Sequence, residues 1–108
     1  MARYLISVEC NCSDPKREGE LHEWYNNTHI PDVLETDGFI SATRYELVHP
    51  VEDKGKFLAV YEIETDDFEA FEAKHGANMK RKMEQNRFTD LVALTSRGVY
   101  KQVLRLDK

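Results

Sequence analysis

The stretch Glu23–Asp32, which reads EWYNNTHIPD, carries a Trp, a Tyr and a His in one helix-like segment that runs into a proline. Pro31 has no backbone N–H, its ring clashes with the carbonyl four residues earlier, and it disfavours helical geometry at Ile30. We therefore expect a helix that passes through Leu21 to end or kink near His29. This arrangement would place a titratable imidazole where helix carbonyls lose their hydrogen-bond partners.

The residues before this stretch predict a strand and then the start of the helix. Residues 3–9 alternate, with every second side chain from Tyr4 to Val8 apolar, which is the pattern of a strand with one face packed on a core. Asp14 followed by Pro15 is typical of an N-cap with proline at the first helical position. The first helix is therefore expected to begin here.

Two further strands are expected after the stretch. Residues 39–48 and 56–64 both alternate, and the polar, turn-rich residues 49–55 between them suit a hairpin connection. Strict alternation would place Phe39 and Tyr45 on the same face of the first of these strands.

The last third of the chain predicts a second helix and a final strand. From residue 68 to residue 83, apolar side chains recur at steps of three and four, which indicates a helix capped by Thr65 or Asp66. Residues 98–106 resume a strand pattern, whereas the mixed residues 87–96 fit neither period.

The expected element order is βαββαβ, which is the order of the ferredoxin-like fold with a four-stranded antiparallel sheet. Right-handed crossovers place both helices on one face of that sheet, and we expect residues 1–108 to form this single α+β domain. Because both parities of the strands carry apolar residues, the second face also needs a cover. The simplest cover is the same face of a second copy, which predicts a homodimer.

Composition excludes several classes of partner. The chain has 15 Lys and Arg against 20 Asp and Glu, a net charge of −5, so we expect no nucleic-acid partner. The apolar run Tyr4–Val8 is too short for a signal-peptide core, and no run of 18 apolar residues predicts a membrane span. A cytoplasmic protein is expected, with Cys10 and Cys12 as ordinary reduced thiols.

Four short segments together resemble the dimeric α+β barrel superfamily, and within it the EthD-like and small polyketide-cyclase-like proteins: Trp24-Tyr25, Thr28-His29-Ile30-Pro31-Asp32, Gly38-Phe39 and Ala42-Thr43-Arg44-Tyr45. The resemblance implies the ferredoxin-like fold and dimerisation through the sheet. It implies no single activity, because members include cofactor-free cyclases, isomerases and monooxygenases, haem-degrading enzymes and proteins with no known reaction.

The candidate catalytic residues are two histidines and a tyrosine. His29 would act as a general base or acid with a pKa near neutrality, or else as a structural imidazole that clamps the helix end. Tyr25, one turn earlier, would orient that imidazole or donate to a substrate oxygen, or simply pack in the core. His75 lies on an apolar helical stripe, where a core role is more common, although some cyclase-like members of this fold place a catalytic histidine in the corresponding helix.

Four further residues are expected to bind substrate: Trp24, Arg44, Tyr45 and Tyr61. Trp24 would form a pocket wall or simply pack. Arg44 is the cation placed to meet a carboxylate or enolate, with a surface ion pair to Glu46 or Glu62 as the alternative. A shift of one residue in strand register would reverse which of these side chains face inward.

No metal and no cofactor are expected. His22 and His29 lie seven apart, but no Cys or acidic residue completes a known zinc spacing. The haem-degrading members of the superfamily use an Asn in the first strand and a Trp in a later element. Here Asn11 falls past the predicted strand and the only Trp lies in the first helix.

Three functions are compatible with these residues. The first is a cofactor-independent enzyme that acts on a small, oxygenated, polyketide-like ring compound by proton transfer, as in cyclisation or isomerisation. The second is a non-catalytic EthD-type dimer that binds a small apolar oxygenated molecule or supports an oxygenase system. The third is a cofactor-free monooxygenase.

Overall fold

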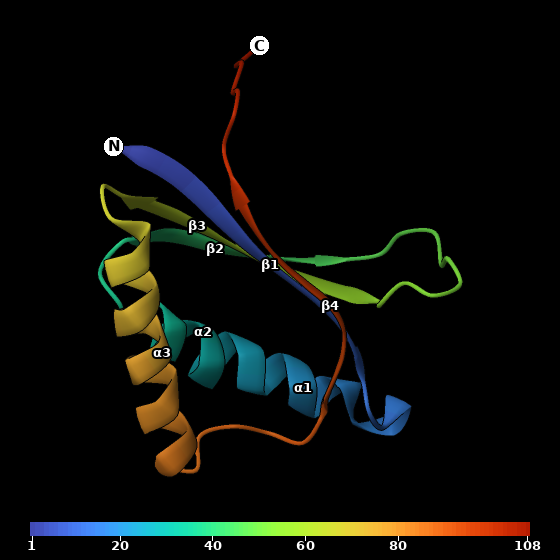
Figure 1. Cartoon of the computed structure of the whole chain (residues 1–108). Coiled ribbons are helices and arrows are strands. Elements are labelled where there is room, and N and C mark those ends of the chain that lie inside the picture. The colour runs from blue at the N-terminus through green and yellow to red at the C-terminus, as the bar shows by residue number, and fades with distance from the viewer.

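The computed structural model describes residues 1–108 as two layers, a four-stranded antiparallel sheet with all helices against one face (Figure 1). The strand order β2-β3-β1-β4 is that of the ferredoxin-like fold, so the predicted fold class is confirmed. The elements are β1 (Ala2–Cys12), the 3-10 helix η1 (Pro15–Arg17), α1 (Glu18–Trp24), the π-helical turn η2 (Tyr25–His29), α2 (Ile30–Val33), β2 (Phe39–Glu46), β3 (Phe57–Thr65), α3 (Phe68–Glu84) and β4 (Val92–Lys101).

The first helical run does not end near His29, which was one of the two outcomes expected, but its geometry changes there to a π turn. The chain passes from α1 through η2 into α2, and Ile30 keeps helical dihedral angles of −60° and −47°. Its backbone N–H donates to the carbonyl of Tyr25, five residues earlier. The wider π turn gives the proline ring room beside the preceding turn, so the helix continues where an α-helix would break.

Strand β2 contains a bulge that changes which side chains face the helices. Phe39 pairs with Ile63 while Ser41 pairs with Glu62, so Ile40 is an extra residue in this strand. After the bulge, Arg44 lies on the face of β2 that is turned toward the helices, because it pairs with the inward-facing Ala59. The expectation that Phe39 and Tyr45 share a face is therefore wrong, because strict alternation does not survive a bulge.

The final strand begins and ends earlier than its sequence pattern predicts. It covers Val92–Lys101, whereas residues 98–106 were expected and residues 87–96 had no assignment. A register shift opposite Glu9 and Cys10 makes Thr95 an extra residue and interrupts the alternation in this strand.

Helix α3 is capped by Asp67, one residue later than predicted. The Asp67 carboxylate accepts a hydrogen bond from the backbone N–H of Ala70 at 3.1 Å. This interaction satisfies one of the free donors at the helix start, as an N-cap should. The cap at Asp14 is as predicted, since its carboxylate accepts from the N–H of Lys16.

The core lies between the sheet and the helices, and the opposite sheet face is uncovered. Twelve buried side chains form this core: Ile6, Cys10, Cys12, Leu21, Tyr25, Val33, Phe57, Ala59, Tyr61, Ile63, Phe71 and Leu91. On the other face Leu5 and Val60 are only half-buried, and Tyr45 and Tyr100 are each more than half exposed. None of the helices is long and apolar enough to cross a membrane.

Gly38, at the entry to β2, is predicted to be essential for stability. Its φ is +114°, and an added Cβ would lie 2.7 Å from the ring of the buried Phe71. Gly38→Ala should therefore lower the free energy of unfolding by about 2 to 4 kcal/mol, measured by urea denaturation. Gly19→Ala is the matched control, because a Cβ at this helical glycine meets nothing within 4 Å and should leave stability unchanged or slightly raised. Equal stability of the Gly38→Ala variant and the wild type would contradict the prediction.

Candidate functional site

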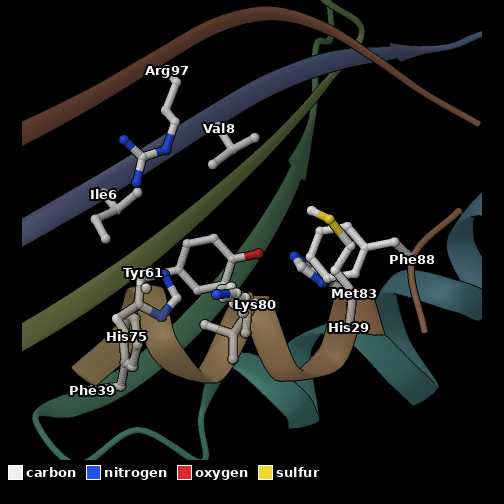
Figure 2. A pocket seen from close by; sticks show the side chains of 13 residues that line it. Ile6, Val8, His29, Phe39, Tyr61, His75, Lys80, Met83, Phe88 and Arg97 are labelled. Carbon is white, nitrogen blue, oxygen red and sulfur yellow. The ribbon is translucent and has the colours of Figure 1, made fainter. Parts of the chain in front are cut away.

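A largely apolar cavity of about 400 Å³ lies between the sheet and the helices. Figure 2 shows its walls, which come from every strand, from the π turn and α2, from α3, and from Phe88 in the segment before β4. Eight of its 13 lining residues are hydrophobic. The polar side chains that reach it are His29, Tyr61, His75, Lys80 and Arg97. A concave, apolar site with a few convergent polar groups is the usual form of a small-molecule site.

The π turn aims His29 into this cavity and stacks it on Trp24. The two rings lie 4.4 Å apart between centroids at an angle of 14°, and Phe88 packs edge-on against the imidazole at 5.7 Å. Trp24 lies five residues earlier, which is the spacing that a π turn brings together. The imidazole makes no hydrogen bond within the protein, so it does not clamp helix carbonyls.

Burial keeps the His29 imidazole neutral. Loss of hydration lowers its pKa to about 4, with a smaller contribution from His75 and against the opposing attraction of Asp32. This value lies below the near-neutral pKa that the sequence led us to expect. At pH 7 the ring is therefore a neutral donor and acceptor in an apolar surrounding.

Hydrogen bonds between the first helical run and the segment before β4 fix the position of His29. Asp32 is 5% exposed, and its carboxylate accepts two hydrogen bonds from the Arg87 guanidinium at 2.7 and 3.1 Å. The Trp24 indole N–H donates to the backbone carbonyl of Arg87 at 2.9 Å. Because Phe88 follows Arg87 directly, these bonds hold its ring against His29.

Two further polar atoms at the cavity are buried and unpaired. The hydroxyl of Tyr61 and the Nδ1 of His75 have no hydrogen-bond partner, and the Tyr61 side chain is 3% exposed. In Figure 2 the Tyr61 hydroxyl points across the cavity toward His29 and Met83. A buried polar group without a partner is costly, so these two atoms make the cavity the candidate functional site.

Burial also sets the protonation states of these two groups. It raises the pKa of the Tyr61 phenol well above its usual value, so the hydroxyl remains a hydrogen-bond donor. Burial, assisted by the positive charge of Arg97, lowers the pKa of His75. Like His29, this imidazole is neutral at pH 7.

Tyr25 and Arg44 lie away from the cavity. The Tyr25 hydroxyl faces the Cys10 sulfur at 3.9 Å rather than the His29 imidazole, and the Arg44 guanidinium covers the Tyr25 ring at 4.5 Å. Arg44 donates to His22 Nδ1 and to the side-chain oxygen of Asn26, both at 3.1 Å. It forms no ion pair with Glu46 or Glu62, because its strand face points to the helices.

The structure thus brings together three of the seven candidate residues at the cavity, namely His29, Tyr61 and His75. Trp24 supports His29 from behind. Tyr45 lies on the uncovered sheet face, 55% exposed, on the opposite side of the sheet.

Sequence reasoning did not single out the cavity residues Lys80, Phe88 and Arg97. Phe88 lies in the segment for which no period could be assigned, and Arg97 follows the bulge in β4. Lys80 occurs among consecutive basic residues that match the expected charge at a helix C-terminus. Only the packing of α3 against the other elements shows that Lys80, and not the adjacent basic residues, reaches the cavity.

The protein contains no group of three or more His, Cys, Asp or Glu side chains arranged to hold a metal ion. Asn11 lies within β1, not beyond it as expected. Its side-chain oxygen accepts from the backbone N–H of Lys56 at 2.9 Å, and alternation from the buried Cys10 turns it to the sheet face away from the cavity. Asn11 is therefore not placed to contact a haem in this cavity.

Comparisons with known proteins agree with this fold. Residues 3–102 match the family model DUF4286, described as a domain of unknown function. An EthD family protein from Bacillus halodurans is 21% identical, with a TM-score of 0.59 over 95% of this chain and 100% of that one. An MhuD variant solved with two manganese protoporphyrin IX molecules per active site is 16% identical, with a TM-score of 0.67 over 98% and 99%.

A proposed monooxygenase from Shewanella loihica is 11% identical, with a TM-score of 0.63 over 98% of this chain and 99% of that one. No curated protein matches the sequence significantly. These structural neighbours, an EthD family protein among them, share the fold of this chain.

The neutral state of the partly buried His29 predicts a loss of stability in mild acid. With a pKa of about 4 in the folded protein and about 6.5 in the unfolded chain, the unfolded state alone takes up a proton between these values. The free energy of unfolding should therefore fall as the pH drops from about 6.5 to about 4, by up to about 3 kcal/mol. His29→Gln should flatten this part of the profile in urea denaturation, whereas His49→Gln, in the exposed β2–β3 loop, should not. Identical profiles for His29→Gln and wild type would refute this assignment.

Proposed function

Because the chain belongs to the DUF4286 family and folds like the dimeric α+β barrel proteins, we propose that it is a cofactor-independent enzyme that moves a proton on a small oxygenated ring compound. The observation that carries this proposal is the convergence of His29 with the unpaired Tyr61 hydroxyl and His75 Nδ1 in one apolar cavity. The reaction class is isomerisation or cyclisation of a polyketide-like substrate.

The proposed step is proton abstraction next to a carbonyl group. A neutral imidazole, from His29 or from His75, accepts the proton, and the electron pair of the broken C–H bond forms an enolate. The Tyr61 hydroxyl donates a hydrogen bond to the enolate oxygen. The negative charge of the enolate stabilises the imidazolium that has formed beside it. Return of the proton to another atom of the substrate completes the isomerisation, so no oxidant or reductant is consumed.

One property of the site favours a second candidate, a non-catalytic small-molecule-binding protein. With a pKa of about 4, the His29 imidazole is a weak base. In that case the same residues would only bind a ligand. The third candidate, a cofactor-free monooxygenase, is supported only by the description of the Shewanella neighbour.

Proton transfer can be tested without knowledge of the natural substrate. We use 2-tetralone, an apolar bicyclic ketone, and follow exchange of its α-protons in D₂O by NMR. Wild-type protein should accelerate exchange, and His29→Gln or His75→Gln should reduce the acceleration by about 10²-fold for whichever residue is the base. Tyr61→Phe should reduce it by about tenfold or more.

Gly76 provides a test of whether the cavity is the site. It lines the cavity from within α3, and a Cβ there meets nothing within 4 Å, so Gly76→Leu would fill the space without disrupting the helix. This variant should abolish both tetralone binding and exchange, while Gly19→Leu in α1 changes neither. If tetralone binds in the cavity but its protons exchange at the uncatalysed rate, the binding-only candidate replaces the enzyme.

We further propose that residues 1–108 act as one domain and dimerise through the uncovered sheet face. Sedimentation at low micromolar concentration should give twice 12.6 kDa. Val60→Lys, a charge in the middle of that face, should give a folded monomer, whereas Val48→Lys in the exposed β2–β3 loop should remain dimeric. A folded wild-type monomer would contradict the proposal.

A further inference from the structure

Two cations reach the cavity without an acidic partner. Arg97 extends from β4 and Lys80 from α3, and both belong to the lining of the cavity (Figure 2). Neither forms an ion pair within 4.0 Å, and no Asp or Glu lines the cavity.

A shortage of acidic residues does not explain why Arg97 and Lys80 lack ion-pair partners. The chain has a net charge of −5, and the neighbouring Lys82 on α3 pairs with Glu35 at 2.7 Å. On the cavity side of the same helix, Lys80 has no such partner. An unpaired lysine or arginine on a surface is common, so the cations alone do not define a site.

The second observation lies deeper in the same cavity. The Tyr61 hydroxyl is buried, has no partner and points into the space, and its ring is one of the walls below Arg97 in Figure 2. A ligand that satisfies this group carries a hydrogen-bond acceptor, such as a carbonyl oxygen, at its buried end, because a phenol with a raised pKa keeps its proton and donates it in a hydrogen bond. The walls between the two ends are apolar, with Met79, Met83 and Phe88 among them.

We propose that the ligand is an organic carboxylate: a ring compound whose carboxylate binds Arg97 and Lys80 at the mouth, while an uncharged oxygen at its far end accepts from Tyr61. The inference rests on the cavity being the site of the proposed function, and it adds the charge of the substrate. Arg97 is the main selector, because its planar guanidinium binds a carboxylate through two hydrogen bonds, whereas Lys80 contributes a mobile point charge.

Binding of such an acid would also change the acid–base groups of the cavity. The positive charge of Arg97 is one cause of the lowered pKa of His75. A carboxylate on Arg97 neutralises that charge, so the pKa of His75 should rise when the ligand is bound. The charge of the substrate would then change the basicity of His75 through its contact with Arg97.

The test uses two probes of nearly equal shape, 1-naphthylacetate and 1-naphthylacetamide, which differ in charge. Isothermal titration calorimetry at pH 7 should show tighter binding of the acetate, and its advantage should shrink at high salt. Arg97→Gln should weaken acetate binding about tenfold and leave amide binding within twofold, with a smaller effect for Lys80→Gln. Lys101→Gln, on the same strand but outside the cavity lining, should change neither probe.

Two different failures can be told apart with Gly76→Leu. If both probes bind wild type, Gly76→Leu blocks both, and Arg97→Gln leaves the acetate-to-amide ratio unchanged, the cavity is the site but charge selection is refuted. If neither probe binds wild type, or Gly76→Leu weakens neither, the cavity is not the ligand site. The proposed function then fails, and the carboxylate inference fails with it.

Discussion

Pro31 cannot donate a hydrogen bond to the turn before it, and the chain accommodates this with a π turn between two α-helical segments. A π turn holds one more residue than an α-helical turn. It stacks the His29 ring on Trp24 instead of leaving His29 at a helix end. Asp32, just beyond the proline, then binds Arg87 and fixes the segment that carries Phe88. The shape of one cavity wall therefore follows from the way a single proline is accommodated.

The cavity combines apolar walls with polar groups that are neutral. Burial lowers the pKa of both imidazoles and raises that of the Tyr61 phenol, so all three groups are uncharged at pH 7. The charges are placed at Arg97 and Lys80 instead. This separation suits a substrate that is apolar in its middle, because a buried charge in the protein would cost several kcal/mol without a partner.

Much of the fold could be predicted from local patterns, and the errors in β2 and β4 have one cause. Alternation in residues 3–9 and 56–64 and the stripe of α3 predicted the element order, since each pattern is set by one buried face. The two bulges, at Ile40 and Thr95, broke that link between position and face. For this reason the sequence predicted neither the sheet face of Arg44 nor the first residue of β4. A bulge depends on pairing with the partner strand, and the local sequence pattern does not indicate it.

The sequence by itself determined the ferredoxin-like order, the superfamily resemblance and the choice of His29 as a candidate site residue, because these depend on periodicity and on a contiguous motif. Only the tertiary structure decided which other side chains meet that histidine. Tyr25, four residues away, turns its hydroxyl to Cys10, whereas Tyr61 and His75, distant in the chain, lie at the same cavity. The physical reason is that a cavity is defined by the packing of several elements, and no single segment carries the information on how the others approach it.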